Sequence, residues 1–206
     1  TANKAITFDS NSNKVVLFWT DGSNVGKAII GTVSSTSISF GSAVTFNSNS
    51  TSYLGCTFDS NSNKVVICFK DGGGSPTNRN WAKVGTVSST SISFGTAVRI
   101  HEDSSSPVFH SINNTVIVGY RDGGNSDHPT FVIGTVSGTS ISFGPRRDMD
   151  QNITWSVEPT MSFDTQSGTV IVGYSDSNNS NYGTLRVGTP SGTDITFGSA
   201  VVYEQA

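Results

Sequence analysis

The most regular feature of the chain is a short apolar run that occurs four times, each time followed closely by an aspartate. The runs read VVLFW from Val15, VVICF from Val65, VIVGY from Val116 and VIVGY from Val170. Side chains alternate between the two faces of a β-strand, so an unbroken apolar run predicts a strand buried on both faces. We therefore expect four inner strands that are each covered by protein on both sides.

Each apolar run belongs to a longer repeat. A second shared block, GTVSSTSISFG, begins at Gly31 and returns unchanged at Gly85, with edited copies at Gly134 and Gly188. A period of about 50 residues indicates a repeat architecture. The four units cover approximately residues 1–50, 51–102, 103–155 and 156–206.

Four strand-like segments, which we name A to D, recur in every unit between residues typical of turns. In the second unit they span residues 53–58, 64–70, 81–87 and 91–100. Inner strands covered on both faces fit a propeller blade better than a sandwich, in which most strands alternate apolar and polar residues. The sequence therefore predicts an all-β fold: residues 1–206 form a single β-propeller of four four-stranded antiparallel blades. The spacing between units also fits a segment of a longer tandem array.

The A–B turns and the two cysteines permit two interpretations each. Residues 9–13 have the Asp-x-Asn-x-Asn spacing of calcium loops but lack the EF-hand glycine and distal glutamate, which favours a hairpin turn held by the aspartate.

If Phe58 pairs with Val66 across the hairpin, Cys56 and Cys68 face each other and a disulfide is conceivable. Two buried thiols that act as small hydrophobic side chains are the favoured alternative.

The repeated pattern FD-x-x-S/T-G-x-V-x-V-x-Y-x-D resembles β-propeller repeat proteins, and is distantly similar to blades of the sialidase-like group. The resemblance covers the whole chain and implies a propeller fold. The Ser-x-Asp-x-Gly-x-Thr-Trp box of that group is absent.

All length variation between the units falls in the B–C loops and the D–A connections. Both emerge at the same end of an up-and-down blade, so a fixed scaffold carries variable loops on one face, as in a binding surface; neutral drift is the alternative. Aromatic rings stack on sugars, and Asp, Asn and Arg bind hydroxyls or carboxylates. The candidate ligand-binding residues are Arg79, Asn80, Trp81, Arg121, Asp127, His128, Arg146, Asp148, Trp155 and Glu158. For Trp81 and Trp155, packing over the blade edges is the alternative.

An aspartate ends strand B in every unit: Asp21, Asp71, Asp122 and Asp176. These residues are weak candidates for a structural cation in the central channel, and caps of their own loops are the favoured alternative. Loop carboxylates such as Glu102, Asp103, Asp148, Asp150 and Glu158 could supply a glycosidase pair, but no catalytic motif accompanies them. We expect no enzymatic activity and no cofactor.

Composition excludes some classes of function. The net charge of -3 and the small number of charged residues do not suit nucleic-acid binding. No apolar stretch approaches the roughly 18 residues that span a bilayer, so we expect no membrane insertion. Because the sequence begins at Thr1, we expect it to be processed or excised from a longer chain.

Taken together, these features predict a non-enzymatic module that binds carbohydrate, with a glycan or surface polymer as its partner. It would be extracellular or on a cell or virion surface. The alternatives are a structural or adhesive repeat module of a larger surface protein or fibre, and a glycosidase-like enzyme.

Overall fold

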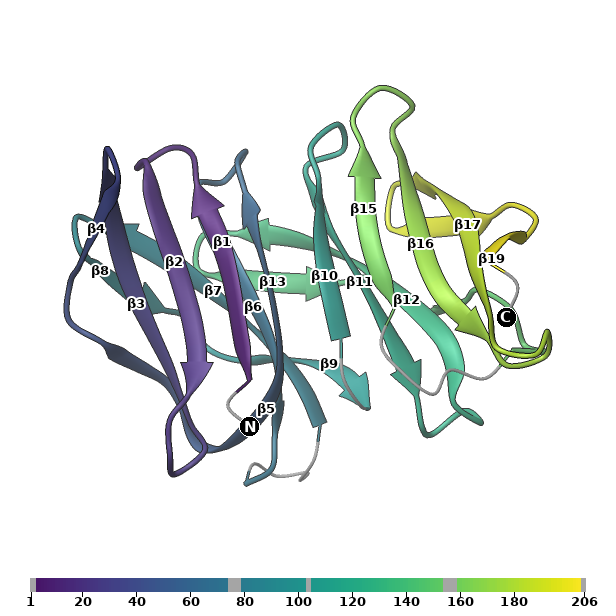
Figure 1. Cartoon of the computed structure of the whole chain (residues 1–206), viewed down its shortest axis with the longest axis horizontal. Helices are drawn as coiled ribbons and strands as arrows, with labels where there is room; N and C mark the ends of the chain where they lie inside the picture. Colours follow the sequence, from purple (N-terminus) through teal and green to yellow (C-terminus); the bar gives the residue numbers. More distant parts are fainter. Residues whose placement is uncertain (1–2, 74–78, 103–104, 154–158, 205–206) are drawn as a thin grey trace.

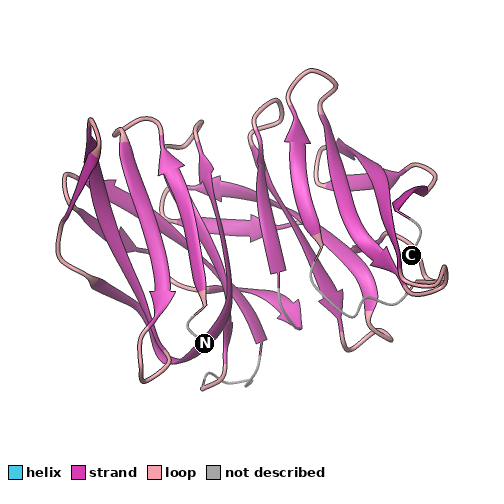
Figure 2. Cartoon of the chain, viewed as in Figure 1, coloured by secondary structure: helices cyan, strands magenta, loops and turns pink. Residues whose placement is uncertain are grey.

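The structure of the chain is a computed structural model that describes residues 3–73, 79–102, 105–153 and 159–204. Within these residues it consists of strands joined by turns and loops, without a helix (Figures 1 and 2). The strands form one curled nine-stranded sheet and two five-stranded sheets. The predicted all-β class is therefore confirmed. In the described part of the chain no helix is long and apolar enough to cross a membrane.

The first two units share the nine-stranded sheet. Its strands are β1 (Lys4–Asp9), β2 (Lys14–Thr20), β3 (Val25–Ser34), β4 (Ser37–Phe40), β5 (Val44–Asp59), β6 (Lys64–Asp71), β7 (Arg79–Ser88), β8 (Ser91–Phe94) and β9 (Val98–Glu102). The third unit forms the sheet of β10 (Ser105–His110), β11 (Thr115–Asp122), β12 (His128–Ser137), β13 (Ser140–Phe143) and β14 (Arg147–Asp148). The fourth forms that of β15 (Thr160–Asp164), β16 (Thr169–Asp176), β17 (Tyr182–Ser191), β18 (Asp194–Phe197) and β19 (Val201–Glu204).

Every unit is an antiparallel meander in the predicted order A, B, C, D. Strand D differs from the prediction, because it is split in two. In the second unit β8 and β9 both pair with β7, and residues 95–97 separate them. Gly95 continues the ladder with a hydrogen bond from its amide to the carbonyl oxygen of Val84 (3.0 Å), after which the chain bends away.

The first unit boundary falls inside a strand, because β5 begins as part of strand D of the first unit and continues as strand A of the second unit. A bulge interrupts β5 near Tyr53, which has a φ of 51°.

The expected hairpin register in the second unit is wrong by one residue. Phe58 pairs with Val65 rather than Val66, and Gly55 rather than Cys56 lies opposite Cys68. The two thiols therefore point to opposite faces and form no disulfide. Burial raises the pKa of the Cys56 thiol to about 12. The favoured interpretation, two thiols packed as hydrophobic side chains, fits this geometry.

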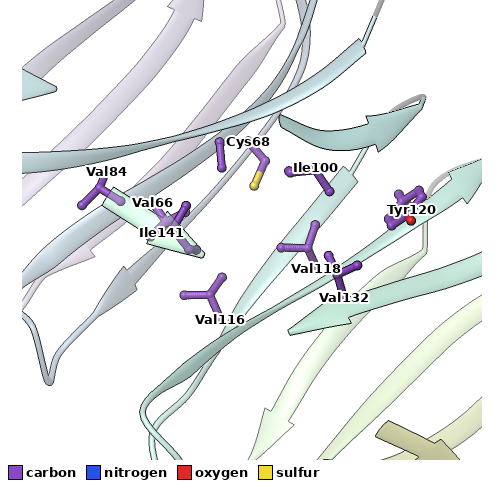
Figure 3. Packing of buried hydrophobic residues seen from close by; sticks show 10 residues of the cluster. Val66, Cys68, Val84, Ile100, Val116, Val118, Tyr120, Val132 and Ile141 are labelled. Carbon is purple, nitrogen blue, oxygen red and sulfur yellow. The ribbon is translucent and has the colours of Figure 1, made fainter. Parts of the chain in front are cut away.

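The core consists of three apolar clusters, each formed between consecutive units. The cluster between the second and third units contains Val66, Cys68, Val84 and Ile100 on one side and Val116, Val118, Tyr120 and Ile141 on the other (Figure 3). Corresponding clusters join the first unit to the second and the third to the fourth. The units are therefore held together by the faces of their inner strands.

Burial of the inner strands depends on the position of the unit in the chain. In the middle units, residues Val65–Phe69 of β6 and Val116–Tyr120 of β11 are buried on both faces, as predicted. In the terminal units, β2 and β16 alternate between buried and half-exposed residues. One face of each terminal unit is therefore not covered, although its sequence is as apolar as in the middle units.

Strand A of each unit lies against strand A of the next: β1 against β5, β5 against β10, and β10 against β15. Among the described residues, no strand of the fourth unit makes a comparable contact with the first. A ring of four blades requires that contact, so the closed four-bladed propeller stays a prediction.

Candidate functional site

Two kinds of loop occupy opposite ends of the strands. The A–B turns lie at the upper end of the view in Figure 1, and the B–C loops of the first, third and fourth units at the lower end. The A–B turns are similar in all units. In the first two, the aspartate carboxylate accepts hydrogen bonds from two backbone amides, and the residue before strand B has a positive φ, 55° at both Asn13 and Asn63. The hairpin-turn interpretation of these aspartates is confirmed.

The four aspartates at the end of strand B cap their own loops. Asp21 accepts hydrogen bonds from the amides of Ser23 (2.9 Å) and Val25 (3.0 Å). Asp71, Asp122 and Asp176 each accept one from the amide two residues later. No group of three or more potential metal ligands occurs among the described residues. These hydrogen bonds are those of the loop caps that the sequence favours, and the cation in the central channel stays a prediction.

A polar hollow of about 560 Å³ opens beside the D–A connection of the third unit. It is lined by Asn125 from the B–C loop and by Arg146, Arg147, Asp148, Met149, Asp150 and Gln151. Two of the predicted binding residues, Arg146 and Asp148, therefore meet in one depression. Guanidinium, carboxylate and amide groups together provide donors and acceptors for hydroxyl or carboxylate groups of a ligand.

Asp148 is held in a fixed orientation by three neighbours. Its Oδ1 accepts a hydrogen bond from Thr130 Oγ1 (3.0 Å), and its Oδ2 accepts one from Asn125 Nδ2 (3.1 Å). Gln151 Nε2 donates a longer bond to the same Oδ2 (3.5 Å). Because Thr130 is fully buried on β12, the carboxylate is anchored to the sheet rather than carried by the loop alone.

Arg146 connects the hollow to the core of the third unit. Its Nη1 donates a 2.6 Å hydrogen bond to Asp122 Oδ2, whose side chain is 1% exposed. His101 from the second unit approaches the other oxygen of Asp122 at 3.5 Å. Burial, together with the charge of Asp122, raises the pKa of the neighbouring Tyr120 phenol. Arg146 thus neutralises a buried carboxylate and keeps the rest of its half-exposed guanidinium at the hollow.

Asp150 and Arg147 link the D–A connection of the third unit to the fourth unit. Arg186 Nη2 donates to Asp150 Oδ2 (2.6 Å), and Arg186 Nε donates to the hydroxyl of Tyr174 (3.2 Å). Burial alone would raise the pKa of Asp150, but the Asn152 amide and Arg186 outweigh burial and lower it. Arg147 forms a two-pronged ion pair with Asp194. Strands on both sides therefore fix the connection that forms the hollow.

The remaining predicted residues lie elsewhere. Arg79 and Asn80 belong to β7, which begins two residues before the expected strand C, and Asn80 is fully buried. Trp81 pairs with Phe69 and packs against the cluster between the first two units, which is the packing alternative considered for it. None of these three lines the hollow.

Three further candidates lie in or beside the third B–C loop: Arg121 near the end of β11, Asp127 in the loop and His128 at the start of β12. Arg121 and Asp127 approach each other at 3.5 Å. Trp155 and Glu158 lie outside the described residues, as does Asp103. Asn125 and Gln151, which do line the hollow, were missed by sequence reasoning because each is an ordinary polar residue in a turn or loop.

A second hollow, of about 350 Å³, is lined by residues in or next to strand A of all four units. The lining residues are Asn3, Lys4, Tyr53, Leu54, Gly55, Ser106, Pro159 and Thr160. Every unit contributes at least one residue to it, all of them in strand A or just before it.

Comparison with known proteins adds no family to this description. No protein-family model matches the chain, and no curated protein matches it.

Proposed function

We propose that the protein is a non-enzymatic carbohydrate-binding module and that a glycan binds in the hollow lined by Asn125 and residues 146–151. The observation that carries this proposal is the composition of the hollow, which combines two arginines, two aspartates and two amide side chains. Such groups match the alternating donors and acceptors of sugar hydroxyls.

The side chains that line the hollow are held in place by hydrogen bonds, which supports a role in ligand binding. Arg146, Asp148 and Asp150 each form hydrogen bonds to residues on strands or at strand ends. A preorganised site loses less side-chain entropy when a ligand binds. The same bonds occupy both carboxylates, which favours recognition over acid–base chemistry.

We propose in addition that the chain has a β-propeller arrangement in which each unit is one blade. Two observations support it: the units pack face to face through their inner strands, and strand A of every unit lines one common hollow. In a propeller the innermost strands surround the central channel. A protein that presents glycan-binding loops on such a scaffold would act outside the cell or on a cell or virion surface, with a glycan or surface polymer as its partner and no cofactor.

The test compares two glutamine variants. A glycan array first identifies a ligand, and calorimetric titration then measures its affinity for Gln151→Ala and for Gln166→Ala. Gln151 lines the hollow through an exposed side chain, whereas Gln166 is an exposed residue of the opposite A–B turn. We expect Gln151→Ala to weaken binding about 5-fold, the loss of about one hydrogen bond, and Gln166→Ala to bind as the unmodified chain does. An array without binding, or equal affinities of the two variants, contradicts the proposal.

A structural or adhesive repeat module is the second candidate. The observation that favours it is the pair of uncovered apolar faces on the first and fourth units, because large exposed apolar patches are typical of protein–protein contacts.

A further inference from the structure

The contact between consecutive units, which we call the joint, has the same composition each time it occurs. One side of each joint is a face of the preceding unit that carries the second half of its strand D, such as Phe46 or Ile100. The other side is the opposite face of the next unit, which carries the first half of its strand D, such as Ile92 or Ile141. The chain contains three such joints, between units one and two, two and three, and three and four. The faces that would form a fourth joint are the free face of the first unit and the free face of the fourth.

The free face of the first unit is apolar. Ile38 is 45% exposed, whereas its equivalents in the later units, all within joints, are 2%, 3% and 4% exposed (Ile92, Ile141 and Ile195). An apolar hollow of about 220 Å³ lies on the same face and is lined by Leu17, Trp19, Ile29 and Phe40. The residues that other units bury in a joint are therefore present here without a covering surface.

The free face of the fourth unit is its counterpart. Val187 is 46% exposed, whereas its equivalents in the three joints are each 1% exposed (Ile30, Val84 and Ile133). Tyr203 on β19 occupies the position of Phe46, which is buried in the first joint. The fourth unit thus presents the same kind of face that every earlier unit uses to bind its successor.

The last glycine of the shared block GTVSSTSISFG lets two consecutive units approach closely at each joint. Three of these glycines lie against a threonine of the next unit: Gly41 against Thr90, Gly95 against Thr139 and Gly144 against Thr193. A Cβ on any of the three would collide with that threonine. The fourth glycine, Gly198, has only its own unit nearby, with Val187 O at 3.7 Å from an added Cβ.

We propose that the free face of the fourth unit docks on the free face of the first unit of a second copy of this chain, and reciprocally. Two copies then close one ring of eight units through two identical joints. The occupant follows from the three joints, because in each of them the equivalent face of unit two, three or four is covered by the face that the fourth unit leaves free. Head-to-tail contacts of this kind form a closed ring when the rotation between units permits it, and eight blades lie within the range of known propellers.

The experiment measures the mass of the full chain by light scattering after size exclusion, over a dilution series. We expect twice the mass of one chain at high concentration and a single-chain mass on dilution. Gly198→Gln blocks the glycine contact without a clash inside its own unit, and Ile38→Glu places a charge on the first-unit face. Each variant should weaken pairing by about 10-fold or more.

Two control variants carry the same types of substitution, Gly→Gln and Ile→Glu, at positions outside the free faces of the first and fourth units. Gly22→Gln alters a loop glycine with no atom within 4 Å of an added Cβ, and Ile112→Glu alters an isoleucine that is 56% exposed in an A–B turn. Both controls should pair as the unmodified chain does. Circular dichroism of each variant checks that its strands are intact.

Mixing the two blocked variants identifies the partner. A Gly198→Gln copy still has an intact first-unit face, and an Ile38→Glu copy still has an intact fourth-unit face. At a concentration where each variant alone runs as a single chain, the mixture should therefore recover two-chain particles through one unmodified joint. A single-chain mass at every concentration, a series of ever larger masses, or no recovery on mixing overturns the proposal.

Discussion

At the scale of single residues, the role of a side chain becomes clear when its contacts are compared with those of the residue at the same position in the other units. His110 shows this most clearly, because it replaces the aspartate that opens the A–B turn elsewhere. Its Nδ1 accepts a hydrogen bond from the amide of Asn113 (3.0 Å), just as Asp9 and Asp59 accept one from the amide three residues later. Its Nε2 then carries the proton and donates to Gly168 O of the fourth unit (3.2 Å). One substitution therefore keeps the turn and adds a contact between units.

Replacing His110 should separate these two roles. His110→Ala removes the acceptor of a turn amide and leaves a space beside Phe163, so we expect it to lower the free energy of unfolding by about 1–3 kcal/mol. His110→Asp restores the acceptor used in the other turns and should cost less than the alanine variant. Urea unfolding of the three proteins checks the order. Equal stabilities of His110→Ala and the unmodified chain would show that the turn does not depend on this side chain.

At the scale of strands and loops, elements that follow from a short stretch of sequence could be predicted. Those that depend on exact turn geometry, or on residues far apart in the sequence, could not. The inner strands and Asx turns follow from local sequence. The register of the second hairpin did not, because Asn63 adopts a positive φ (55°) and closes the turn with one residue fewer than expected. The hollow depends on pairs such as Arg146 with Asp122, which are 24 residues apart, so no local spacing reveals it.

The Arg186–Asp150 ion pair is the contact that should decide how firmly the D–A connection is held. Arg186→Met leaves Asp150 without its cation, and both side chains are largely buried, at 14% and 21% exposed. We expect the free energy of unfolding at neutral pH to fall by about 1–3 kcal/mol. Lys27→Met is the control, because Lys27 and Asp21 are 3.9 Å apart and more exposed, and such pairs contribute little.

The pH dependence of this effect has a defined sign. The pKa of Asp150 is lowered in the folded protein, so its contribution to stability is present above the unfolded-state pKa and is lost as pH falls through the folded-state pKa. The difference between Arg186→Met and the unmodified chain should therefore shrink in acid, below the ordinary aspartate pKa of 3.8. Urea unfolding at neutral pH and in acid measures both values. A difference that stays constant or grows in acid contradicts the assignment.

At the scale of the whole molecule, the repeat explains why stability should be uneven along the chain. Each unit buries its apolar strand only against neighbours, as in other repeat proteins. The two middle units have a neighbour on both faces, and the two terminal units have one. The sequence predicts equal burial because all four inner strands are equally apolar. Position in the array, which no local pattern encodes, makes the difference.

Hydrogen exchange of backbone amides should reveal this difference directly. In dilute protein we expect β6 and β11 to exchange most slowly, since opening them breaks two joints, and β2 and β16 to exchange faster, since opening either breaks one. At high concentration, docking of a second copy should slow β2 and β16, while β11 serves as an internal control that does not change. The measurement is exchange followed by mass spectrometry of peptides from each strand, at two protein concentrations. If β2 and β16 exchange as slowly as β11 in dilute protein, the terminal faces are already covered within one chain, and the ring closes without a partner.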